Sequence, residues 1–111
     1  MGIDCDIIIR ADVNPAGIVW PPGFRLEPAD ERDKEQCEGA THYVFSLMRY
    51  FGPYYERGWW PTICYVLLQL MTHPDVKKVW YAGDVHEHKP EVTPELIDEL
   101  TNLWLSRKRD P

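Results

Sequence analysis

The hydrophobic pattern first predicts a β-strand over residues 3–11, where a run of β-branched isoleucines is flanked by charged residues. It also predicts a strand over residues 76–82 and two short strands over 18–20 and 24–26, which two prolines and a glycine separate. Alternate residues of a strand point to opposite faces of a sheet. One face of the first strand would carry Ile3, Cys5, Ile7 and Ile9, and the other Asp4, Asp6, Ile8 and Arg10.

Helical spacing of apolar residues is clearest in residues 60–72, where Pro61 suits the first turn of a helix. Because this segment is apolar around most of its circumference, we expect a central buried helix. A last helix over residues 93–109 would be capped by Thr93. The apolar stripes are Trp60, Ile63, Cys64, Leu67, Leu68 and Met71 in the first helix, and Leu96, Leu100, Leu103 and Trp104 in the second.

Two further segments have a weaker pattern. Residues 41–51 fit a helix better than a strand, because Val44, Leu47, Met48 and Phe51 recur at helical spacing ahead of a Gly-Pro stop. We therefore predict a helix there, although the many β-forming residues leave a strand as the alternative. Residues 28–38 are polar and indicate a loop or a short surface helix.

Together these elements predict one α+β domain over residues 1–111. The first strand and the 76–82 strand would lie side by side, with helices over one face. The expected architecture is a two-layer sandwich, in which a small, mostly antiparallel sheet is packed by about three helices. A chain of 111 residues is long enough to bury a core of its own.

Charge adds two acidic blocks to this picture. The chain has 18 Asp and Glu against 12 Lys and Arg, and most of the excess acid falls in residues 27–38 and 84–99. Acidic segments cannot neutralise phosphates, so we expect no direct binding of nucleic acid. They suit a partner protein with a basic surface. The chain also lacks an apolar run long enough to span a membrane, so we expect no membrane association.

The cysteines indicate a reducing compartment. Cys5, Cys37 and Cys64 are odd in number, widely spaced and without a C-x-x-C motif, which is typical of free thiols. Cys5 and Cys64 lie in apolar patterns and are predicted in the core, whereas Cys37 lies in a polar segment and is predicted at the surface. The opening residues lack the features of a signal peptide. We therefore expect a cytoplasmic location.

Aromatic residues gather in residues 43–60, with two arginines among them. Tyr, Trp and Arg are frequent anchors of protein interfaces, although core packing accounts for several of these side chains. We predict that aromatic loop residues and acidic residues bind a partner together. The predicted binding residues are Tyr54, Tyr55, Arg57 and Trp59 in the loop, and Glu31, Asp33, Glu35 and Glu38 in the first acidic block.

A candidate metal site follows the 76–82 strand. Asp84, His86 and His88 offer a carboxylate and two imidazoles, to which Asp4 or Asp6 could add a carboxylate. A divalent metal there would lower the pKa of a bound water, as in a metal-dependent hydrolase. This is the alternative to our expectation of no cofactor. The chain contains no G-x-S-x-G or nucleotide-binding motif, so no catalytic residue is assigned.

Three short motifs carry a resemblance. Met1-Gly2-Ile3-Asp4, Tyr55-Glu56-Arg57-Gly58-Trp59 and Val79-Trp80-Tyr81-Ala82-Gly83-Asp84 resemble small uncharacterised proteins of phages, prophages and bacteria. The resemblance implies a phage-linked accessory role in the host cytoplasm, such as an inhibitor of a host complex of the anti-CRISPR kind. We expect a non-enzymatic protein that binds a basic surface of a host nucleic-acid-handling or defence complex. A homodimer with the aromatic loop as its interface is a further alternative.

Overall fold

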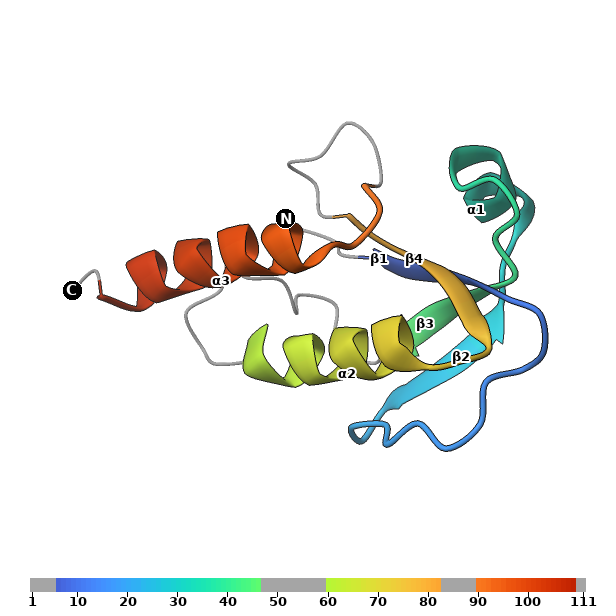
Figure 1. Ribbon diagram of the computed structural model, residues 1–111, viewed down its shortest axis with the longest axis horizontal. Helices are drawn as coiled ribbons and strands as arrows, with labels where there is room; N and C mark the ends of the chain where they lie inside the picture. Colours follow the sequence, from blue (N-terminus) through green and yellow to red (C-terminus); the bar gives the residue numbers. More distant parts are fainter. Residues whose placement is uncertain (1–5, 47–59, 83–89, 110–111) are drawn as a thin grey trace.

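The computed structural model describes residues 6–46, 60–82 and 90–109, which form four strands and three helices (Figure 1). Five of these elements lie where the hydrophobic pattern predicted them, and the predicted α+β class is confirmed. In chain order the elements are β1 (Asp6–Ala11), β2 (Phe24–Pro28), α1 (Glu31–Gln36), β3 (His42–Ser46), α2 (Trp60–Thr72), β4 (Val76–Ala82) and α3 (Pro94–Arg109).

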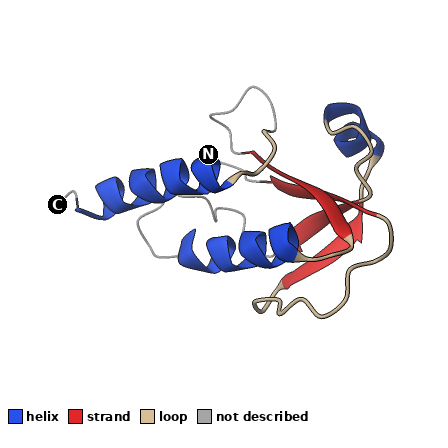
Figure 2. Ribbon diagram, viewed as in Figure 1, coloured by secondary structure: helices blue, strands red, loops and turns tan. Residues whose placement is uncertain are grey.

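The sheet has the strand order β2-β3-β1-β4, and each of its three pairings is antiparallel (Figure 2). β1 is a central strand, and its Ile8 lies between Tyr43 of β3 and Trp80 of β4. The predicted neighbourhood of the first strand and the 76–82 strand is therefore confirmed. Residues 90–92 extend the outer edge of β4, because the amide of Val92 donates to the carbonyl of Val79 and that of Tyr81 to Pro90.

The helix predicted over residues 41–51 is wrong for residues 42–46, which form β3. Val44 is buried against the main core, whereas Tyr43 and Phe45 point to the other face of the sheet. The helical pattern depended on Leu47, Met48 and Phe51, which lie outside the described residues. β3 pairs with β1 on one side and with β2 on the other. These ladders stabilise the strand, which was the alternative prediction based on the many β-forming residues of this segment.

The short strand predicted over residues 18–20 is also wrong. Ile18 and Trp20 pack against the core, but the segment pairs with a side chain instead of a strand. The Gln69 amide group accepts a hydrogen bond from the Val19 amide at 2.8 Å and donates one to the Val19 carbonyl at 2.9 Å. His73 Nε2 lies 2.7 Å from the carbonyl oxygen of Ala16. These contacts replace a ladder and hold the loop against α2.

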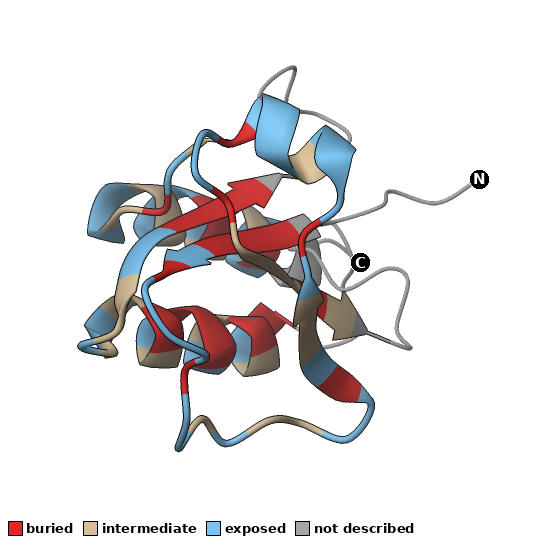
Figure 3. Ribbon diagram, turned by 90° about the vertical axis from the view of Figure 1, so that its right-hand side faces the viewer, coloured by how far each residue is buried: buried red, intermediate tan, exposed pale blue. Residues whose placement is uncertain are grey.

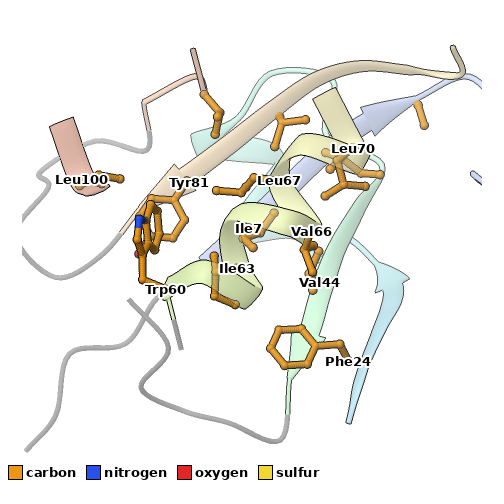
Figure 4. Close-up of a cluster of buried hydrophobic side chains, with 14 of the residues drawn as sticks. Ile7, Phe24, Val44, Trp60, Ile63, Val66, Leu67, Leu70, Tyr81 and Leu100 are labelled. Atoms are coloured by element: carbon orange, nitrogen blue, oxygen red, sulfur yellow. The ribbon is translucent and has the colours of Figure 1, made fainter. Parts of the chain in front are cut away.

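α2 packs on one face of the sheet and α3 packs beside α2, and the main core is formed by residues of the strands and of both helices (Figure 4). Trp60 lies at the end of this core near Leu100 and is 1% exposed, with its ring in an edge contact with Tyr81 at 5.8 Å between the ring centres. Its Nε1 donates to Thr101 Oγ1 of α3 at 2.9 Å, which ties the two helices together. Burial also raises the pKa of the neighbouring Cys64 thiol, despite a hydrogen bond with Thr101 that opposes the shift.

α3 begins as predicted. Thr93 Oγ1 accepts a hydrogen bond from the amide of Leu96, so Thr93 is the N-cap. Leu100 and Trp104 are buried and Leu96 and Leu103 are partly buried, which confirms the predicted stripe.

α2 is not the central buried helix that was expected. Its buried residues are Trp60, Ile63, Val66, Leu67 and Leu70, and they cover only the side that faces the sheet. On the opposite side Leu68 is 50% exposed and Tyr65 is 51% exposed. The sequence pattern was apolar on both sides of the helix, but a two-layer sandwich covers only one of them.

Candidate interaction surface

The candidate site lies on the face of the sheet that points away from α2 and α3. α1 and α2 lie on opposite sides of the sheet (Figure 3). A second, smaller core on this face joins Ile8 and Trp80 of the sheet to Ala29, Cys37 and Ala40, the residues that flank α1. These flanking residues attach the α1 segment to the sheet.

Cys37 is the most deeply buried of these flanking residues. It was predicted at the surface because its sequence neighbours are polar, but only 1% of it is exposed. Cys37 directly follows α1, and its amide donates to the carbonyl of Asp33 at 2.8 Å. Gly39 then turns the chain with a φ of 83° and packs closely against the Arg10 side chain. The polar segment thus returns to the sheet immediately after the helix.

α1 itself contributes nothing to either core, since none of its six residues is buried. A helix this short has too few internal hydrogen bonds to form alone. It is held by a capping box: the Asp33 amide donates to Asp30 Oδ1 at 2.8 Å, and the Asp30 amide donates to Asp33 Oδ2 at 3.3 Å. The cap and the flanking anchors fix the helix and leave its side chains in solvent.

The four predicted acidic residues therefore have two different roles. Asp33 is part of the capping box, so its carboxylate is occupied in holding the helix. Glu31, Glu35 and Glu38 are exposed. Glu31 Oε1 lies 3.8 Å from Lys34 Nζ. Because 91% of the Glu31 side chain is exposed, this ion pair contributes little to the free energy of unfolding. Three carboxylates remain available on or next to α1.

The neighbouring half of the sheet face carries partly exposed aromatic side chains. Phe45 of β3 lies opposite Arg25 of β2, whose guanidinium carbon is 4.2 Å from the centre of the Phe45 ring. Arg25 also donates to Glu27 at 2.6 Å, and Glu27 lies opposite Tyr43. Alternate residues of β2, Arg25 and Glu27, therefore lead from the Phe45 ring towards α1. We call the set Arg25, Glu27, Glu31, Glu35, Glu38, Tyr43 and Phe45 the α1 surface.

The sequence drew attention to Tyr43 and Phe45 as part of an aromatic cluster, but it assigned them to a helix. Their shared face with Arg25 was therefore missed. The alternation of Tyr43, Val44 and Phe45 is the signal that could have revealed it, because a strand places the two aromatic rings together and the valine opposite.

The other predicted binding residues do not enter this surface. Tyr54, Tyr55, Arg57 and Trp59 of the aromatic loop lie outside the described residues, which resume at Trp60. The second acidic block is described from residue 90, and Glu91, Glu95, Asp98 and Glu99 are exposed on the edge of β4 and on α3. α3 extends towards the end of the long axis opposite α1 (Figure 1), so the two acidic blocks form separate surfaces.

The predicted metal residues Asp84, His86, His88 and Asp4 also lie outside the described residues. Asp6 is described through its backbone, which pairs with Ala82 of β4. Within residues 6–46, 60–82 and 90–109, no three or more His, Cys, Asp or Glu side chains are grouped so that they could hold a metal ion.

Comparisons of the chain with known protein families, with curated proteins and with solved structures find no match. None of the helices in the described residues is both long enough and apolar enough to cross a membrane.

Proposed function

We propose that this protein is a non-enzymatic binding protein, and that its α1 surface docks onto a basic surface of a partner protein. One observation carries the proposal: α1 buries none of its residues, yet a capping box and the anchors Ala29, Cys37 and Ala40 hold it on the sheet. A helix that adds nothing to the core but is fixed at both ends suits the presentation of side chains to another molecule.

The chemistry of the α1 surface defines the partner. Glu31, Glu35 and Glu38 supply three exposed negative charges, against the two exposed positive charges of Arg32 and Lys34 on the same segment. Such charges accelerate the encounter with a basic surface and orient it. Phe45 and Tyr43 offer partly exposed aromatic area, which is the usual source of affinity at the centre of an interface. We therefore assign steering to the carboxylates and contact area to the rings.

Basic protein surfaces commonly bind the phosphates of nucleic acids. A protein that covers such a surface with carboxylates competes with the nucleic acid for the same lysines and arginines. Together with the resemblance of its motifs to phage and prophage proteins, this supports a role as an inhibitor of a host nucleic-acid-handling or defence complex.

The test uses two matched variants of the tagged protein. Glu31→Gln/Glu35→Gln/Glu38→Gln removes three negative charges from the α1 segment, and Glu95→Gln/Asp98→Asn/Glu99→Gln removes three from α3. Each is used to capture proteins from a bacterial lysate, with and without added duplex DNA. We expect wild type and the α3 variant to retain the same basic proteins, and the α1 variant to lose them.

Added DNA should also displace those proteins from wild type, because the two ligands share one surface. Equal capture by the two variants, or capture that DNA leaves unchanged, would contradict the proposal. Far-UV circular dichroism checks that both variants keep the fold.

A further inference from the structure

The outer side of α2 is an exposed stripe without charge. Pro61, Tyr65, Leu68 and Thr72 are the exposed residues of this helix, and their spacing of four, three and four places them along one line. Tyr65 and Leu68 are each about half exposed, although both are large and apolar or aromatic. Val19, which Gln69 holds beside the helix, adds a further apolar side chain that is 62% exposed.

The absence of charge distinguishes α2 from the other two helices. None of the thirteen residues of α2 is Asp, Glu, Lys or Arg. α1 exposes Glu31 and Glu35, and α3 exposes Glu95, Asp98 and Glu99. A basic partner is attracted to α1 or α3, but the α2 stripe offers nothing to attract or orient it.

We propose that the α2 stripe is the contact between two copies of this chain. In a two-fold symmetric dimer the same patch faces itself, so any net charge on the patch repels its own copy. With a net charge of −6, this chain opposes self-association over its acidic helices. α2 is the helix on which two copies can meet through apolar area without that repulsion.

The expected dimer is weak. The stripe is one helix wide, and thirteen residues span about 20 Å. An interface one helix wide is small, and small interfaces are typical of weak, transient complexes. The interface is apolar while the net charges of the two copies repel, so added salt should strengthen the dimer by screening that repulsion.

The dimer leaves the α1 surface free. The stripe points away from the sheet on the side of α2, and the α1 surface lies on the opposite face. Two copies joined through α2 would carry their α1 surfaces on opposite outer sides and could bind two partner molecules. The dimer does not require the proposed partner, so the two proposals can fail separately.

Sedimentation equilibrium tests the contact on the purified full chain, from low to high micromolar concentration and at low and high salt. Leu68→Glu places a carboxylate against its own copy at the centre of the stripe. Leu105→Glu is the control, because Leu105 is a partly exposed leucine on α3. We expect wild type and Leu105→Glu to shift from monomer to dimer with concentration, more strongly in high salt, and Leu68→Glu to remain monomeric.

Three results would overturn the proposal: a wild-type monomer at every concentration, a Leu68→Glu dimer as strong as the wild-type one, or a dimer that salt dissociates. Because Leu68 is half exposed, its replacement should leave the fold intact, which circular dichroism checks. Leu68→Glu should still capture the partner of the α1 surface, and loss of that capture would count against the proposed function and not against the dimer.

Discussion

The hydrogen bond between Trp60 and Thr101 allows a quantitative test of how α3 docks on α2. Thr101→Val has nearly the same shape but removes the oxygen that accepts the Trp60 Nε1 proton at 2.9 Å. Trp60 is 1% exposed, so water cannot replace the lost acceptor. A buried donor left without an acceptor costs about 1–3 kcal/mol of the free energy of unfolding. Thr and Val have similar helix propensities, so the helix itself contributes little to the difference.

Two companion variants isolate the hydrogen bond from other effects. Thr101→Ser keeps an acceptor and loses a methyl group, so we expect a smaller loss of stability than for Thr101→Val. In a Trp60→Phe background the donor is already absent, and Thr101→Val should then cost little. The coupling energy of this double-mutant cycle should be about 1 kcal/mol or more, in the range found for residues in contact.

Urea unfolding followed by circular dichroism gives the four free energies of the cycle. The slopes with urea should be equal among the variants, since each unfolds to the same extent. A Thr101→Val cost that is the same with tryptophan and with phenylalanine at position 60 would show that this hydrogen bond does not hold α3 on α2.

Three further predictions concern α1 and the cysteines. Cys37→Ala deletes a buried sulfur from the second core and should lower the free energy of unfolding by about 1 kcal/mol, measured by urea titration, and an unchanged free energy would contradict the role of Cys37 as an anchor. Asp30→Ala removes the cap of α1 and should cost about 1 kcal/mol locally, seen as faster hydrogen exchange of the Asp33 and Lys34 amides; unchanged exchange would contradict the cap. Burial raises the pKa of Cys64, so the folded state holds the thiol proton to higher pH than the unfolded state. The stability that depends on this proton is complete below the pKa of the unfolded state and falls as the pH rises above it. Cys64→Ala should therefore lose less stability than wild type between about pH 8 and about pH 10. An equal loss in the two proteins would contradict the raised pKa of Cys64.

The elements that were predicted correctly are those whose secondary structure is determined by their own residues. The isoleucines of β1, the apolar stripe of α2 and the Thr93 cap of α3 each combine a regular pattern with a local signal. β3 was mispredicted because its apolar residues fit both the helical repeat of about 3.6 residues and the two-residue repeat of a strand. The ladders with β1 and β2 select the strand, and they are formed by residues that are distant in the sequence.

The candidate site was predictable only in part. The acidic block was visible in the sequence. That Asp33 caps the helix while the three glutamates are exposed to solvent depends on where α1 begins. The Asp30-to-Asp33 spacing before a polar helix could have indicated the capping box. The burial of Cys37 and the shared face of Arg25 and Phe45 depend on how the chain returns to the sheet and on strand register, neither of which is encoded locally.

The most direct test of the central claim is the affinity of one captured, purified partner for the α1 surface, measured by isothermal titration calorimetry at several salt concentrations. We predict that Glu31→Gln/Glu35→Gln/Glu38→Gln weakens binding by at least about tenfold, or about 1.4 kcal/mol. It should also flatten the salt dependence, while Glu95→Gln/Asp98→Asn/Glu99→Gln binds like wild type. Equal affinity and equal salt dependence for the two variants would contradict the account.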